Sequence, residues 1–197
     1  MIITVASYKG GVGKTTTSVH LAAYLQRSTP TLLVDGDPNR SATKWAKRGS
    51  LPFRIIDERL LAKYGRDFKN IVIDTEARPS EEDMATLIEG CDLLILPTTP
   101  DVLALDALGL TIETLESIGA KNYKVLLTIV PPKPSHDADE AREMLNASGV
   151  PMFKSQISRR VAFQKAALAG MIVSETRDQR AESAWKEYMA VGKEIKK

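Results

Sequence analysis

The chain has 197 residues, 43% of them hydrophobic and 26% charged, which suits one globular domain, residues 1–197, with a sizeable core. Its 27 lysines and arginines against 25 acidic residues give a net charge of +2. Charge alone therefore does not indicate a nucleic-acid-binding protein, although a basic face can be hidden in that balance. The single cysteine, Cys91, excludes an internal disulfide and is expected to be a buried apolar residue. We find no signal-peptide pattern and no apolar run near the ~20 residues of a membrane span, so we expect a cytoplasmic protein.

Short apolar runs alternate with amphipathic helical patterns along the chain. The apolar runs predict strands at Ile2–Ala6, Thr31–Val34, Phe53–Ile56, Asn70–Ile73, Leu93–Leu96 and Val125–Ile129, with a weaker one near Met152–Phe153. The amphipathic patterns predict helices at Lys14–Arg27, Arg40–Lys47, Glu81–Glu89, Ala104–Ile118, Ala138–Ala147, Arg160–Ala169 and Arg177–Ile195. Strands rich in Val, Ile and Leu that alternate with helices indicate an α/β fold, a doubly wound, mostly parallel sheet with helices on both faces. Such sheets bind ligands at the carboxyl ends of their strands.

A glycine-rich loop separates the first strand from the first helix. Such a turn is typical of a phosphate-binding site, because its backbone N–H groups approach the oxygens closely and the helix N-terminus is partially positive. We expect nucleotide contacts from the whole loop, namely Lys9, Gly10, Gly11, Val12, Gly13, Lys14, Thr15 and Thr16. Within it, Lys14 is placed to reach the β- and γ-phosphates and the Thr15 hydroxyl to ligate Mg²⁺.

The loop departs from the usual pattern G-x-x-x-x-G-K-[ST], because Tyr8 stands where the first glycine is expected. The variant that fits completely, K-G-G-x-G-K-T-T, carries a second lysine, Lys9. It resembles the deviant Walker A box of the ParA/MinD family, in which this extra lysine reaches across a dimer to the partner's nucleotide. The resemblance implies a P-loop NTPase-like fold and a homodimer with ATP sandwiched between its subunits. The alternative, a glycine-rich turn with incidental lysines, is disfavoured by the strand before the loop and the helix after it.

Two predicted strands end in carboxylates. Asp35 and Asp37 follow the strand at 31–34, and Asp74 follows the strand at 70–73, so all three should share the loop's edge of a parallel sheet. The first pair resembles the family's D-x-D-P-Q box and Asp74 its Walker B aspartate. By that resemblance Asp37 orients or activates the attacking water, Asp35 supports the magnesium shell, and Asp74 holds magnesium through a water. The alternatives are an Asp-Gly-Asp-Pro turn for the first pair and a helix N-cap for Asp74.

The expected chemistry is hydrolysis of ATP with Mg²⁺. No guanine-reading Asn-Lys-x-Asp motif is present, which disfavours a GTPase, and we expect the segments around 129–134 and 155–160 to hold the base. Phosphoryl transfer depends mainly on positioning and charge neutralisation. The residues expected to act on the phosphates are Lys9, Lys14 and Asp37. The residues expected to hold the metal are Thr15, Asp35 and Asp74.

Residues 152–176 also resemble short ParA-type partition ATPases, through Ile157-x-Arg159, a small-residue helix and Val173-x-Glu175. Many such proteins bind DNA without sequence preference once they have dimerised on ATP, which implies nucleoid association of the ATP-bound form. Basic residues are scattered between Lys154 and Lys197. From them we select as DNA-binding candidates Arg159, Arg160, Lys165 and Lys186. The alternative is a solvated helix face with alternating charge.

The resemblance implies an ATPase that a ParB-like or McdB-like adaptor protein turns over to position a cargo. That cargo would be a plasmid, a chromosome region or a carboxysome-like organelle. The alternative is a MinD-type regulator gated by nucleotide at a membrane or protein surface. We do not expect membrane anchoring, because the tail from Tyr188 onward has no bulky apolar cluster. A metabolic ligase or metal-insertase relative would need further substrate or cysteine motifs, and none is found.

Overall fold

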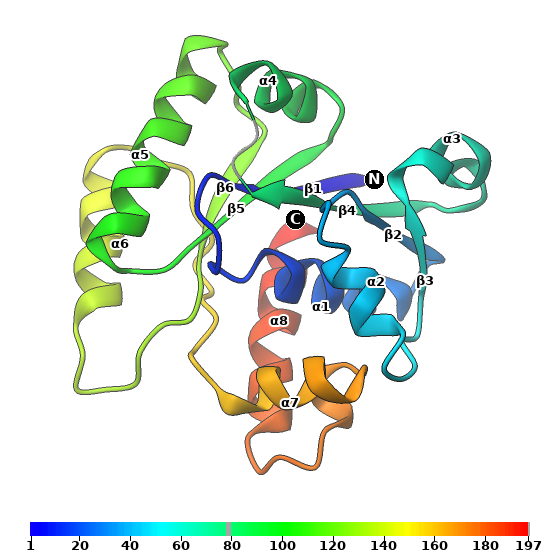
Figure 1. The fold of residues 1–197 in the computed structure, drawn as a ribbon. Helices are drawn as coiled ribbons and strands as arrows, with labels where there is room; N and C mark the ends of the chain where they lie inside the picture. Colours follow the sequence, from blue (N-terminus) through cyan, green and yellow to red (C-terminus); the bar gives the residue numbers. More distant parts are fainter. Residues whose placement is uncertain (78–79, 197) are drawn as a thin grey trace.

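The computed structural model describes residues 1–77 and 80–196, and their strands form a six-stranded sheet (Figure 1). The strands are β1 (Ile2–Ser7), β2 (Thr31–Asp35), β3 (Arg54–Asp57), β4 (Asn70–Ala77), β5 (Leu93–Thr98) and β6 (Tyr123–Leu127). They lie in the order β3-β2-β4-β1-β5-β6, and each pair of neighbours is parallel. This confirms the predicted parallel α/β sheet.

Helices cover both faces of this sheet. They are α1 (Lys14–Gln26), α2 (Ser41–Ala46), α3 (Leu61–Tyr64), α4 (Glu81–Glu89), α5 (Val102–Ser117), α6 (Asp137–Ala147), α7 (Val161–Ala169) and α8 (Ala181–Ile195). One face packs against α1, α2, α7 and α8, and the other against α4, α5 and α6 (Figure 1). Successive strand residues point to opposite faces, so Leu33 joins the first core and Leu32 packs beneath α3 on the second face.

The structure differs from the predicted elements in several places. β4 continues through Asp74 to Ala77 instead of ending at residue 73, and β6 spans residues 123–127 instead of 125–129. Residues 58–67, for which the sequence pattern predicts no element, form α3 between two 3₁₀ turns and cover Leu32 and Ile56. The weak strand near Met152 is only an isolated bridge to Val125. The last helix begins at Ala181 rather than at residue 177, because a turn whose carbonyl at Asp178 accepts from the Ala181 N–H precedes it.

A buried aromatic cluster fastens α1 to the C-terminal helices. His20 stacks on Tyr188 with ring centroids 4.8 Å apart, and Phe163 meets both rings edge-on. The His20 ring donates through Nδ1 to the Thr16 carbonyl at 2.7 Å and accepts through Nε2 from the Val173 N–H at 3.0 Å. Both bonds fix a neutral tautomer, and burial lowers the pKa of His20 to about 4. Tyr188 is therefore packed in the buried core between α1 and the C-terminal helices.

The sheet brings the predicted carboxylates together at one edge. In the register of the parallel strands, Asp74 lies beside Asp35 on one side and beside Val5 on the other. Two residues after Val5, β1 ends and the chain enters the glycine-rich loop. The loop and Asp35 therefore lie at the carboxyl ends of β1 and β2, and Asp74 lies beside Asp35 within β4. This is the side of an open parallel sheet where ligands bind.

Candidate functional site

The loop of residues 8–13 requires glycine at two positions. Gly11 has φ 80° and Gly13 φ 87°, a left-handed backbone that costs a residue with a Cβ roughly 1 kcal/mol or more. A Cβ at Gly11 would meet no atom of the described residues within 4 Å, so the backbone, and not crowding, selects glycine there. Gly13 is also the N-cap of α1, and its carbonyl accepts from the Thr17 N–H at 2.9 Å. This arrangement leaves the first N–H groups of α1 available to an anion.

The two lysines of the loop point to different partners. The Lys14 ammonium lies 3.4 Å from the Lys9 carbonyl, across the mouth of the loop. Burial lowers the pKa of Lys14, while the nearby charges of Asp74 and Asp37 oppose that change. The Lys9 ammonium instead pairs with Asp101 at 2.7 Å, at the start of α5. The Lys14 ammonium therefore lies against the loop backbone, whereas the Lys9 ammonium is paired outside the loop, and their contacts with phosphates stay a prediction.

Asp35 and Asp74 are fully buried side by side. One oxygen of Asp74 accepts from the Ser18 hydroxyl at 3.0 Å, and one oxygen of Asp35 accepts from the Thr43 N–H at 2.8 Å. The other oxygen of each carboxylate has no hydrogen-bond partner among the described residues. Burial raises the pKa of Asp74 to about 7, and the neighbouring Asp35 charge adds to this rise. Two buried oxygens without partners are costly unless a ligand satisfies them.

These donors fit a magnesium ion. Mg²⁺ prefers hard oxygen ligands and usually keeps several waters, with one or two carboxylates and substrate phosphates completing its shell. The Thr15 hydroxyl at the start of α1 and the free oxygens of Asp35 and Asp74 are of this kind. Within residues 1–77 and 80–196, no group of three His, Cys, Asp or Glu side chains forms a metal cage. The donor set suits an ion that arrives with a nucleotide.

Asp37 lies at the same edge, and both of its oxygens are bonded within its own turn. Oδ1 accepts from the Asn39 N–H at 2.9 Å, and Oδ2 accepts from the Ser41 hydroxyl at 3.1 Å. Its charge is close enough to raise the pKa of Lys14 against the effect of burial. The structure thus brings Asp37 near Lys14, and its role in positioning water stays a prediction.

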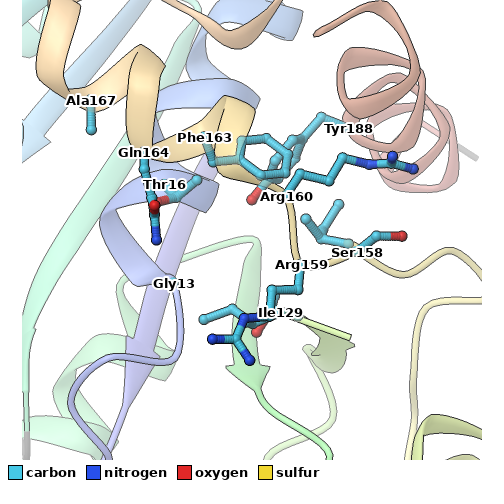
Figure 2. Close-up of a pocket in the computed structure, with 12 residues that line it drawn as sticks. Gly13, Thr16, Ile129, Ser158, Arg159, Arg160, Phe163, Gln164, Ala167 and Tyr188 are labelled. Atoms are coloured by element: carbon cyan, nitrogen blue, oxygen red, sulfur yellow. The ribbon is translucent and has the colours of Figure 1, made fainter. Parts of the chain in front are cut away.

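A cavity of about 390 Å³ adjoins the loop (Figure 2). Its lining comes from the loop and α1, the end of β6, residues 157–160, α7 and α8. The residues are Gly13, Thr16, Thr128, Ile129, Ile157, Ser158, Arg159, Arg160, Phe163, Gln164, Ala167 and Tyr188. Its place and size suit the nucleoside of a nucleotide whose phosphates lie in the loop. The predicted base-binding segments line it in part, whereas the contributions of α7 and α8 were not foreseen.

The predicted DNA-binding residues are mostly paired within the chain. Ion pairs of 2.7 Å join Arg160 to Glu187, Lys165 to Asp178, and Lys186 to Glu182. A second cavity brings together five of the ten basic residues between Lys154 and Lys197, and Lys186 is not among them. Those lining it are Arg159, Arg160, Lys165, Arg177 and Arg180. Position 197 lies outside the described residues.

The chain is similar to known nucleotide-binding proteins in sequence and in fold. Residues 3–173 match the CobQ/CobB/MinD/ParA nucleotide binding domain. The chain is 36% identical over 201 residues to the "maintenance of carboxysome distribution protein A" of Gloeobacter kilaueensis, covering 98% of this chain and 93% of that protein. It is 32% identical over 180 residues to a Rhizobium radiobacter protein ParA, covering 82% and 80%. The structure of a Cyanothece McdA–ATP complex superposes with a TM-score of 0.75 at 21% identity, covering 97% and 96%, which shows a shared fold.

The matched residues include the loop and both buried aspartates, and the curated relatives are matched over most of their length. In the part of the chain that the structure describes, no helix has the length and apolar character to cross a membrane. The chain therefore belongs to the CobQ/CobB/MinD/ParA family of nucleotide-binding domains, as an ATPase homologous to the McdA and ParA partition ATPases.

Proposed function

We propose that the chain is a single P-loop ATPase domain that binds Mg-ATP, dimerises on it, and positions a cargo along DNA. The observation that carries the proposal is the meeting of a left-handed glycine loop with two buried carboxylates, each with one oxygen that has no hydrogen-bond partner in the described part of the chain. A phosphate loop alone would suit any anion. The free oxygens at the neighbouring strand ends add the donors that a magnesium nucleotide requires.

Each residue of the site has a defined task in this proposal. The loop amides and Lys14 disperse charge on the phosphates, and Thr15, Asp35 and Asp74 hold magnesium, directly or through water. When bound, magnesium neutralises charge on the phosphate oxygens. Asp37 orients the attacking water, which requires it to release one of its bonds to Asn39 or Ser41. The cavity beside Gly13 receives the nucleoside.

Dimerisation would take Lys9 from Asp101 to the partner's nucleotide. Within one chain the Lys9 ammonium pairs with Asp101, away from the loop's phosphate side. That pair is partly exposed and is worth about 1 kcal/mol or less, so a polyphosphate from a second subunit can compete for the lysine. ATP would then link two chains by mass action, and hydrolysis would release them.

The cluster of Arg159, Arg177 and Arg180 supports binding to nonspecific DNA. Neighbouring guanidinium groups suit a phosphate backbone, and such binding weakens with salt by a log–log slope of about −0.9 for each phosphate contact. Retention on DNA-cellulose with Mg-ATP at rising salt tests this. We expect Arg159→Ala and Arg177→Ala to lower both retention and slope, with Arg66→Ala, an exposed arginine of the 65–67 turn, unchanged. Equal retention of all variants would overturn it.

The relatives support a choice of cargo and adaptor for this proposal. One is a carboxysome distribution protein and the other a ParA, both matched over four fifths or more of the chain. They support a carboxysome-like organelle or a plasmid as cargo, with an McdB-like or ParB-like adaptor. The MinD-type alternative predicts flotation with liposomes in the presence of ATP. DNA retention without liposome flotation favours partition, and the reverse result favours the alternative.

A further inference from the structure

Thr128 connects the end of β6 to the phosphate loop. Its side chain is buried, and its hydroxyl donates to the Val12 carbonyl at 2.7 Å, with the Thr98 carbonyl at 3.0 Å. The Thr98 carbonyl already accepts from the Thr128 N–H at 2.8 Å. The Val12 carbonyl, in contrast, has no other hydrogen bond within the described part of the chain. The Thr128 hydroxyl is therefore the contact that holds this peptide of the loop.

Holding the Val12 carbonyl also orients the amide of Gly13. The two groups belong to one planar trans peptide, so the N–H points opposite to the carbonyl. With the carbonyl turned toward Thr128, the Gly13 N–H is turned away from the β6 end. We propose that Thr128 is a positioning residue that presents the Gly13 amide to the nucleotide phosphates. This inference rests on the proposed binding of ATP in the loop.

The residues that follow Thr128 are fixed by hydrogen bonds to another segment of the chain. The next residue, Ile129, adopts φ 51°, a left-handed conformation that is an outlier for a β-branched side chain. After that reversal, Val130 donates to the Ile157 carbonyl at 3.0 Å and accepts from the Arg159 N–H at 2.8 Å. Ile129 therefore lies between two sets of hydrogen bonds. Thr128 before it bonds the phosphate loop, and Val130 after it bonds residues 157 and 159 in the cavity wall. Ile129 itself also lines the cavity (Figure 2).

Strain at such a place has a physical consequence. A left-handed isoleucine persists only where the surrounding contacts over-determine it, and here those contacts are the bonds of its two neighbours. The backbone at Thr128 is thus held in place by these hydrogen bonds, so the position of its hydroxyl does not depend on a bound ligand. A donor fixed in this way can preorganise the loop before the nucleotide arrives.

The test compares Thr128→Val, which keeps the shape and removes the donor, with Thr128→Ser, which keeps the hydroxyl. Calorimetric titration with Mg-ATP, Mg-ADP and adenosine measures binding to each full-length variant. Loss of one oriented amide on a phosphate corresponds to roughly 10- to 100-fold weaker binding. We expect this loss for ATP and ADP with Thr128→Val, a clearly smaller loss for adenosine, which has no phosphates, and recovery with Thr128→Ser. Thr111→Val is the matched control, because among the described residues that buried hydroxyl bonds only the Ala107 carbonyl of its own helix.

The outcomes separate this inference from the proposed function. If the wild-type chain does not bind Mg-ATP, the proposed function fails. If it binds and Thr128→Val binds equally well, the role of Thr128 is overturned. An equal loss for ATP and adenosine would also overturn it, because a disturbed fold weakens both. Thr128→Ala, which keeps the backbone hydrogen bonds, serves in the same comparison if the valine variant does not fold.

Discussion

Protonation of His20 should destabilise the fold in a measurable pH window. The buried ring uses both nitrogens as a neutral group, and its pKa falls to about 4 in the folded chain. In the unfolded chain the same group titrates near its ordinary value of about 6.5. The unfolded state therefore binds the proton first as the pH falls, and the free energy of unfolding decreases between about pH 6.5 and pH 4. A difference of about 2.5 pKa units corresponds to about 3.4 kcal/mol.

Denaturant unfolding of wild type and His20→Gln from pH 8 to pH 4.5 measures this effect. Subtracting the two curves cancels the other titrating groups, including Asp74, whose raised pKa acts in the opposite direction. We expect a constant difference above pH 7 that then shrinks by up to about 1.4 kcal/mol per pH unit. The variant His136→Gln, at an exposed position, controls for the replacement of a histidine. A difference between wild type and His20→Gln that stays flat to pH 4.5 would refute the reasoning.

Three further substitutions test the loop, the lysine contact and the core. Gly13→Ala should abolish binding of a fluorescent ATP analogue and cost roughly 1 kcal/mol or more of stability in thermal unfolding, because alanine resists φ 87°. Asp101→Asn keeps a helix-capping side chain but removes the charge that holds the loop's first lysine, so light scattering should show dimers at lower ATP concentration; unchanged dimerisation would contradict this. Gly192→Ala should lower the melting temperature, because its Cβ would overlap the Tyr24 ring at an overpacking cost of about 1–3 kcal/mol. A Cβ at Gly109 meets no described atom within 4 Å, so Gly109→Ala should not lower the melting temperature.

The elements of the site that were predicted share a local signal. The loop follows a strand within a few residues, and Asp35 and Asp74 each lie at the end of an apolar run. Their meeting at one edge then follows from the geometry of parallel strands, and the observed register places them side by side. These features can be predicted because they depend on the hydrophobic pattern of each strand and on which residues come directly after it.

The remaining features depend on contacts between distant residues. Lys9 and Asp101 are 92 residues apart, and no spacing rule links a loop lysine to the cap of a later helix. The bond from Thr128 to Val12 likewise joins residues 116 positions apart. The ion pair of Arg160 with Glu187 depends on how α8 packs. Such pairings are set by tertiary packing, which composition and periodicity do not report.

Short elements were missed for a different reason. Residues 58–67 fold as one turn of α-helix between two 3₁₀ turns, and a four-residue helix is too short to show a helical period in the sequence. It forms because the apolar side chains of Leu61 and Tyr64 cover the strand residues Leu32 and Ile56. The burial of those strands, and not helix propensity, therefore selects this structure.

The most direct test of the account is the mass of the protein in solution with Mg-ATP. Multi-angle light scattering should show a monomer without nucleotide and a dimer with Mg-ATP. Lys9→Ala should remain monomeric with Mg-ATP while still binding it, and Lys121→Ala, which lies before β6 at the opposite edge of the sheet, should dimerise like wild type. A mass that does not change with ATP, or a Lys9→Ala variant that dimerises as readily as wild type, would contradict an ATP-sandwich dimer.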